Sequence, residues 1–298
     1  MDVVSIVIPT LNRPACLARA IASALAQQGD PRLEIVVIDN SADSSARADH
    51  PTIRILREPR PGIANARNAG VAAARGEWIA FLDDDEEASP RWIANLLAVA
   101  RRTGADAVFG PIEARAEGGK MGGFSPYFSR TLAAADGADI TTLSAHLGTN
   151  NSMFHRDCLD GAEPFDIRLN VIGGEDSLLI ERLKLGGRRF AWAARASVIE
   201  WAPPRRLTWA YVRKRKFLSG QIRVFVQRMA SPSRWDRIAV WMGIGLAQFV
   251  LAGVAALALR PLAPDRSARA RATAWGGLGK VLWQARFRPT LYGAGLVS

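Results

Sequence analysis

Cysteine and histidine are scarce in this chain of 298 residues. The two cysteines, Cys16 and Cys158, form no CxxC pair and no zinc-like spacing, which argues against a disulfide framework and a structural zinc site. The three histidines form no HxH or HExxH pattern, so neither a catalytic triad nor a zinc enzyme is expected. A P-loop of the form GxxxxGKS/T is also missing. A reducing cytosol fits the cysteine usage best.

Acidic residues are nearly absent from the last third of the chain. Residues 1–203 hold 22 Lys and Arg against 26 Asp and Glu, a net charge of −4, whereas residues 204–298 hold 17 against 2, a net charge of +15. A basic segment of this kind usually meets an anionic surface, either nucleic acid or the inner leaflet of a membrane. The first ten residues have no basic stretch before an apolar core and no cleavage site, so we expect no signal peptide.

The first 200 residues alternate between β-branched apolar stretches and stretches with apolar residues at helical spacing. The predicted strands cover residues 3–9, 33–40, 53–58, 77–85, 105–114, 148–159, 188–193 and 196–202. The predicted helices cover residues 10–29, 62–76, 89–104, 173–187 and 203–229. Strands that alternate with helices indicate a largely parallel sheet covered on both faces. Residues 114–145, rich in Gly, Ala, Ser and Thr, are expected to form either a long loop over a site or a disordered insertion.

A run of 22 uncharged, mostly apolar residues at 238–259 is long enough to cross the hydrocarbon core of a bilayer. Arginines flank both ends, so the positive-inside rule predicts no orientation. A single span, an interfacial helix and a hairpin with the weaker segment 273–284 are alternatives. A buried helix of a soluble oligomer is another. We expect contact with a membrane.

Five carboxylates in a row, Asp83 to Glu87, follow an apolar run. Neighbouring carboxylates raise each other's pKa unless a cation or hydrogen bonds hold the charge. In an extended strand, Asp83 and Asp85 would point to one side and Asp84 to the other. Two carboxylates at the carboxyl end of a sheet strand suit Mg²⁺ or Mn²⁺, with a diphosphate completing the metal's ligands. A solvated acidic loop is the alternative.

Other polar residues lie at predicted strand ends and within predicted helices. Asp39 ends a strand at the same edge of the sheet, where a carboxylate can accept hydrogen bonds from a base or ribose. Arg67 and Asn68 are a cation and an amide suited to a diphosphate, although a surface helix would carry them equally well. Glu175 and Asp176 follow two glycines at a helix start, where the helix dipole favours negative charge. A carboxylate there is also well placed to accept a proton from an attacking hydroxyl.

Six short segments, taken in order, resemble the family 2 inverting glycosyltransferases, which have the GT-A fold of nucleotide-diphospho-sugar transferases. The segments are SIVIPTLNRPACLARAIAS, VVIDNS, PGIANARNAG, FLDDDEEASPRWI, GTNNSMF and GGEDSLL. The resemblance covers residues 3–220. Residues 198–221 are similar to the subgroup that acts in bacterial exopolysaccharide assembly, including succinoglycan-type enzymes that extend lipid-linked sugars. Many relatives have a metal-binding histidine near this point, whereas this sequence has Glu200.

The resemblance implies a role for each motif residue. Asp176 is the expected general base, and Asp85 is expected to hold Mg²⁺ or Mn²⁺ on the donor's diphosphate. Glu175, Asn150 and Asn151 are the acceptor-side candidates. The expected nucleotide-sugar-binding residues are Thr10, Asn12, Arg13, Asp39, Arg67, Asn68, Asp83 and Asp84.

The sequence therefore predicts an α/β protein of GT-A fold, with a mixed sheet flanked by helices. A catalytic domain at residues 1–220 precedes a basic and hydrophobic helical tail at residues 221–298 that associates with a membrane. The predicted activity transfers a sugar, with inversion, from a nucleotide diphosphate (UDP-hexose by default) to a hydroxyl of a glycan acceptor on a polyprenyl diphosphate. The protein is expected to act in polysaccharide biosynthesis. Its expected location is the cytoplasmic face of the inner membrane, and no nucleic-acid partner is expected. The alternative is a basic adaptor for membranes or nucleic acid with an idle α/β domain.

Overall fold

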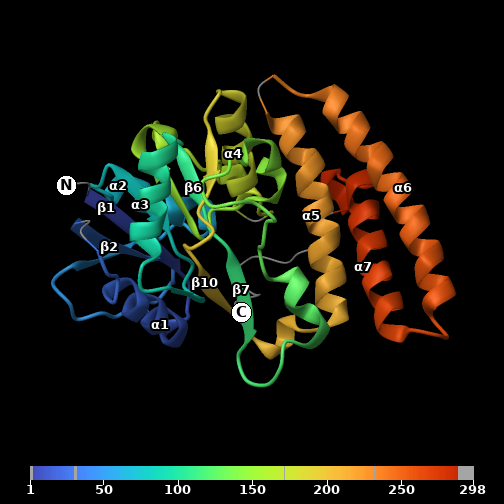
Figure 1. Cartoon of the computed structure of the whole chain (residues 1–298), viewed down its shortest axis with the longest axis horizontal. Helices are drawn as coiled ribbons and strands as arrows, with labels where there is room; N and C mark the ends of the chain where they lie inside the picture. The colour runs from blue at the N-terminus through green and yellow to red at the C-terminus, as the bar shows by residue number, and fades with distance from the viewer. Residues whose placement is uncertain (1–2, 30–31, 171, 231, 288–298) are drawn as a thin grey trace.

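The computed structural model describes residues 3–29, 32–170, 172–230 and 232–287 and shows an α/β half beside three long helices (Figure 1). Its strands are β1 (Val3–Thr10), β2 (Arg32–Asp39), β3 (Ile53–Arg57), β4 (Trp78–Phe81), β5 (Glu86–Ala88), β6 (Ala107–Phe109), β7 (Ile112–Ala116), β8 (Ser152–His155), β9 (Phe190–Trp192) and β10 (Val198–Ala202). Its α-helices are α1 (Pro14–Leu25), α2 (Ile63–Ala73), α3 (Trp92–Thr103), α4 (Glu175–Leu185), α5 (Trp209–Met229), α6 (Trp235–Leu259) and α7 (Pro264–Val281). Short 3₁₀ helices are η1 (Gly122–Tyr127), η2 (Thr141–His146), η3 (Arg156–Leu159), η4 (Ile167–Leu169), η5 (Pro204–Arg206) and η6 (Ala285–Phe287).

The main sheet has the strand order β3-β2-β1-β4-β8-β6-β9. Its first four strands are parallel, and β8 runs antiparallel to β4 and β6. Because side chains alternate along a strand, Ile6 and Ile8 of β1 share a core with α1 and α3, whereas Val7 packs into the opposite core with α2 and α4. The predicted mixed sheet flanked by helices is therefore confirmed.

The carboxyl ends of β1 and β4 meet at one edge of this sheet, since the two strands pair in parallel with Val7 opposite Phe81. The acidic residues after β4 leave the sheet beside Thr10 and lead into β5. A second sheet, with the order β5-β10-β7, pairs β5 antiparallel and β7 parallel to β10. The acidic segment therefore lies between the two sheets.

The segment predicted to be a loop or a disordered insertion is ordered in short pieces. After β7 it forms η1 and η2, and it buries the side chains of Phe128 and Ile140. Arg130 within it pairs with Ile112 through two backbone hydrogen bonds of 2.9 and 3.0 Å. The segment is thus part of the folded α/β half.

Helices α5, α6 and α7 lie side by side next to the α/β half (Figure 1). The predicted domain boundary at residue 220 falls inside α5, which is one continuous helix. This helix packs against α4 through Val226 and Leu178. Residues 209–220 therefore belong to the same helix as the start of the predicted tail.

The outer face of α6 is exposed and apolar. Leu251, Val254 and Leu257 are 71%, 62% and 72% exposed. Within the described part of the chain, α6 alone is long and apolar enough to cross a bilayer, with a mean hydropathy of 2.1 over a stretch that is 11% buried. Such a face is unusual for a soluble monomer and marks an interaction surface.

Glycines bring the backbone of α7 against both neighbouring helices. A Cβ atom on Gly279 would overlap the carbonyl oxygen of Phe217 in α5, and a Cβ atom on Gly277 would overlap the carbonyl oxygen of Gly245 in α6. Only a residue without a side chain allows this approach. The three helices are therefore packed backbone to backbone at these points.

Candidate active site

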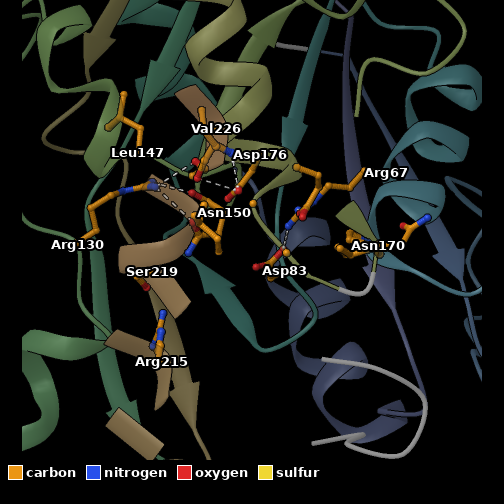
Figure 2. A pocket seen from close by; sticks show the side chains of 18 of the residues that line it. Arg67, Asp83, Arg130, Leu147, Asn150, Asn170, Asp176, Arg215, Ser219 and Val226 are labelled. Atoms are coloured by element: carbon orange, nitrogen blue, oxygen red, sulfur yellow. Dashed lines mark hydrogen bonds and ion pairs between the residues drawn. The ribbon is translucent and has the colours of Figure 1, made fainter. Parts of the chain in front are cut away.

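A cavity of about 1700 Å³ opens between the carboxyl ends of β1 and β4, the start of α4, and α5. Figure 2 shows Asp176 of α4 and Arg215, Ser219 and Val226 of α5 lining the same pocket as Asp83. Its volume exceeds the roughly 300–1,000 Å³ of a pocket for one small ligand, so two substrates can meet in it. The predicted site residues in its lining are Thr10, Asn12, Arg13, Arg67, Asp83, Asp84, Asp85, Asn150, Glu175 and Asp176.

Two of the aspartates after β4 are tied to β1, to the residue before α1 and to η5. Thr10 Oγ1 donates a hydrogen bond of 2.8 Å to Asp84 Oδ2. Arg13 Nη1 lies 3.0 Å from Asp84 Oδ1 and 3.1 Å from Asp85 Oδ2. Arg206, in η5, reaches Asp85 Oδ2 from the other side at 3.2 Å. Guanidinium groups therefore flank the acidic segment where it enters the cavity.

The three aspartates do not alternate as they would in a strand. The strand β4 ends before them, and the chain turns at Asp84 and Asp85. Asp84 and Asp85 share Arg13, whereas Asp83 contacts Arg67 Nη2 at 3.4 Å. The prediction that Asp83 and Asp85 point together is therefore wrong, because the turn rotates Asp84 and Asp85 toward one cation.

Several carboxyl groups of the site have pKa values above their usual range. Burial is the largest cause that raises the pKa of Asp84 to about 6 and that of Glu200, on β10, to about 7; the charge of Asp85 adds to both. Burial also raises the pKa of Glu86 well above its usual range, and Glu86 Oε1 has no hydrogen-bond partner among the described residues. Burial and the neighbouring negative charges therefore favour the protonated form of these carboxyl groups, and a bound cation would favour their charged form.

The start of α4 presents two adjacent carboxylates in different surroundings. Gly174, with φ of +91°, forms the left-handed turn before the helix. Asp176 is half-buried in the cavity wall, and its Oδ1 accepts hydrogen bonds of 2.6 and 3.2 Å from the backbone and hydroxyl of Ser177. Glu175 is buried and paired with Arg67, and burial raises its pKa to about 7. Asp176 is thus the more accessible proton acceptor.

A sequence profile described as glycosyl transferase family 2 matches residues 5–159, slightly more than half of the chain. The chain belongs to this family. Two curated relatives come from Rhizobium meliloti (strain 1021). The succinoglycan biosynthesis protein ExoM is 34% identical over 64% of this chain and 63% of its own length, and ExoO is 34% identical over 62% and 57%. The chain therefore spans about three fifths of these relatives.

Solved structures support the fold of this family 2 member. The crystal structure of S. aureus TarS 1-349 in complex with UDP superposes with a TM-score of 0.51 at 17% identity, covering 94% of this chain and 90% of TarS. At this identity the likeness concerns the fold alone, and it agrees with the predicted GT-A fold.

The acidic turn of this family 2 chain supplies too few ligands to hold a metal ion without a bound substrate. Asp85 and Glu200 lie together in the cavity wall, where the backbone N–H of Trp201 donates to the carbonyl of Asp85 at 2.9 Å. Within the described ranges, no three His, Cys, Asp or Glu side chains are arranged to hold a metal. Since Mg²⁺ commonly binds one or two carboxylates plus substrate phosphates, the residues fit an ion held by Asp85 and a bound diphosphate.

Arg130 is a positioning residue that the sequence does not reveal. Its half-buried side chain donates to the backbone carbonyls of Gly110 at 2.9 Å, Gly148 at 3.2 Å, and Asn150 and Asn151 at 2.7 Å each. Burial lowers its pKa to about 10. Figure 2 shows Arg130 reaching the loop that carries Asn150 toward Asp176. In the sequence it is only one of two arginines in a segment rich in small residues.

Three predicted site residues do not line the cavity: Asp39, Asn68 and Asn151. The Asp39 carboxylate accepts two backbone N–H groups of the following loop, at 2.9 and 2.8 Å. Asn68 exchanges hydrogen bonds of 2.8 and 2.9 Å with the backbone of Phe165. Asn151 is fully buried, accepts from the indole N–H of Trp92 at 2.7 Å and donates to two backbone carbonyls. These side chains hold the surrounding loops, so direct contact with a ligand has no support from the structure.

Proposed function

We propose that the protein is an inverting hexosyltransferase that moves a sugar from a nucleotide diphosphate to a hydroxyl of a glycan acceptor. The observation that carries the proposal is the meeting of two motifs in one cavity. The acidic turn follows β4, and Asp176 starts α4, yet both line the same space. The membership in family 2 supports the reaction class.

The donor fits the side of the cavity beside the acidic turn. Arg13 and Arg206 both contact Asp85 Oδ2, and planar guanidinium groups can bind diphosphate oxygens in pairs. Thr10 and Asn12 lie at the carboxyl end of β1, where open α/β sheets bind nucleotides. The crystal structure of TarS 1-349 holds UDP, so UDP-sugars are the first donors to test.

Asp176 then acts as the general base. It accepts the proton of the acceptor hydroxyl while that oxygen attacks the anomeric carbon and the bond to the donor's phosphate oxygen breaks. One in-line displacement inverts the configuration, and no covalent sugar–enzyme intermediate forms. The two hydrogen bonds from Ser177 hold the Asp176 carboxylate in one orientation for this step.

Mg²⁺ or Mn²⁺ held by Asp85 would neutralise charge on the leaving diphosphate. The chain contributes to the same end through Arg13 and Arg206, whose guanidinium groups stand beside Asp85. These arginines would bind and orient the diphosphate whichever ion is used.

The acceptor is proposed to be a glycan on a polyprenyl diphosphate, used in polysaccharide biosynthesis at the cytoplasmic face of the inner membrane. The exposed apolar face of α6 and the net charge of +15 over residues 204–298 suit an anionic bilayer surface. The names of ExoM and ExoO, which refer to succinoglycan biosynthesis, support the process.

The test is nucleotide release by the full-length protein in mild detergent. A panel of UDP-, GDP- and dTDP-sugars is incubated with Mg²⁺, Mn²⁺ or EDTA, and free nucleotide diphosphate is measured. We expect slow, metal-dependent release from one donor. Equal release in EDTA would remove the metal from the proposal, and no release together with no donor binding by calorimetry would reject the transferase itself.

A further inference from the structure

Four basic side chains of α5 line the cavity, Lys214, Arg215, Lys216 and Arg223, and the last two lie toward α6 and η2. Lys216 Nζ lies 5.4 Å from the centre of the Tyr127 ring. Arg223 donates a 2.7 Å hydrogen bond to the carbonyl of Ala145 in η2 and lies 5.0 Å from the centre of the Trp241 ring in α6. Within the described ranges, neither forms an ion pair with a carboxylate. Lys216, Arg223 and neighbouring His146, which also lines the cavity, are called the cation cluster below.

The members of the cation cluster repel one another. Burial is the largest cause that lowers the pKa of Lys216 and of His146; the charge of Arg223 lowers both further, and Lys216 also acts on His146. Behind them, burial lowers the pKa of Lys280 in α7 to about 8, with Arg223 and Lys216 adding to the effect. An anion placed among these groups would relieve their repulsion.

The cation cluster lies between the expected base and the apolar helix. Along α5, Ile222 lies against Gly174 at the start of α4, and Val226 lines the cavity together with Asp176 (Figure 2). On the other side, Arg237 and Trp241 from the first turns of α6 line the same cavity. One continuous wall therefore leads from the expected base, past positive charge, to the helix with the exposed apolar face.

We propose that the cation cluster binds the phosphate groups of a lipid-linked acceptor. This inference rests on the proposed function and names the residues that would bind the acceptor. Lys216 and Arg223 are two helical turns apart, a rise of about 10 Å, so their long side chains can hold a diphosphate between them. The attached sugar then extends toward Asp176, and the lipid chain leaves along the apolar face of α6. A lipid diphosphate has an anionic part that matches the cation cluster and an apolar part that matches α6. A soluble phosphate has only the anionic part.

The experiment compares three probes: farnesyl diphosphate, farnesol and inorganic pyrophosphate. Binding to full-length protein in a nonionic detergent is measured by thermophoresis with saturating UDP present, so that the donor side is occupied. The double variant Lys216→Gln/Arg223→Gln is compared with Arg213→Gln, which removes a charge from the same helix outside the cavity. We expect farnesyl diphosphate to bind the double variant roughly tenfold more weakly or worse, because charge-assisted hydrogen bonds are lost, and Arg213→Gln to bind like the wild type.

The probes separate the two sources of phosphate. Farnesol should bind at least tenfold more weakly than farnesyl diphosphate, and so should pyrophosphate. Pyrophosphate that binds as tightly as farnesyl diphosphate would assign the cation cluster to a soluble anion and overturn the lipid. Equal binding of farnesyl diphosphate to the double variant and the wild type would overturn the site.

Donor binding is read independently by calorimetry with UDP on the same proteins. The double variant should bind UDP like the wild type, which also shows that it is folded. Wild-type protein that binds farnesyl diphosphate but no nucleotide would reject the proposed donor and keep the phosphate site. The reverse result would reject the phosphate site alone.

Discussion

The two halves of the protein contribute opposite chemistry to one cavity. The α/β half brings buried carboxylates, several of which form ion pairs with Arg13, Arg67 and Arg206. The helical half brings Lys216 and Arg223, which have no carboxylate partner in the described part of the chain, and an exposed apolar helix. The basic tail is therefore more than an attachment, since its first helix forms a wall of the site.

The largest effect is expected for Asp176→Asn in the α/β half. The amide cannot accept the acceptor's proton, so the transfer rate should fall by roughly 10²- to 10⁴-fold, while donor affinity stays the same. The rate is measured by transfer to acceptor and the affinity by calorimetry with UDP. Asp160→Asn, at an exposed position, is the matched control and should retain full activity. A fully active Asp176→Asn protein would remove this residue from the role of base.

Arg130→Met should have the next largest effect, because it leaves four backbone carbonyls of the loops around the site without their donor. We expect the free energy of unfolding to fall by about 3 kcal/mol, and the KM for acceptor to rise more than that for donor. Chemical denaturation and steady-state kinetics measure the two. Arg195→Met, on the exposed surface, should change neither. If the two variants behave alike, Arg130 does not hold the loop.

The α/β half was largely predictable because its information is local. Strand and helix periodicity is set by neighbouring residues, and the acidic segment is conspicuous without any partner. The sequence could not reveal hydrogen bonds between residues that are far apart in the chain. Asn68 bonds the backbone of Phe165 and Asn151 bonds Trp92, so both side chains are engaged by groups that only the fold brings near. Arg130 was missed for the same reason.

The helical half was less predictable. Its apolar and basic stretches show in the sequence, but the pattern does not reveal which faces meet. The predicted boundary at residue 220 fell inside α5. This helix packs against both the α/β half and the other two long helices, and its sequence periodicity shows no break between the two. From the sequence alone, the glycines of α7 only lower its helix propensity. The structure shows that they allow the backbones of α5 and α6 to approach closely.

A smaller effect separates two glycines within the helical half. Gly279→Ala places a methyl group on the carbonyl oxygen of Phe217, so α5 and α7 must separate, and stability should fall by about 1–3 kcal/mol. Gly253→Ala, in α6, meets no atom within 4 Å and should stabilise the protein by about 0.5–1 kcal/mol, because alanine favours helix. Thermal unfolding in detergent measures both. Equal changes would show that the helices are not packed backbone to backbone.

The smallest effect on stability is expected on the apolar face of α6. Leu251→Glu and Val254→Glu together replace exposed side chains, so the free energy of unfolding should change by about 0.5 kcal/mol or less. Binding to vesicles with anionic lipids should nevertheless be lost in a flotation assay, since the face can no longer enter the bilayer. Leu25→Glu, exposed in the α/β half, is the control and should float like the wild type.

Under the proposed function, the continuity of α5 has a consequence for the length of the glycan product. This helix of 21 residues is about 30 Å long and is fixed to the cavity at one side and to α6 and α7 at the other. With α6 resting on a bilayer, the reacting groups would be held at a constant height above the lipid. A lipid-linked glycan would then be extended only while its free end is at that height. The distance between the bilayer and the active site would therefore select acceptors by the number of sugars they carry.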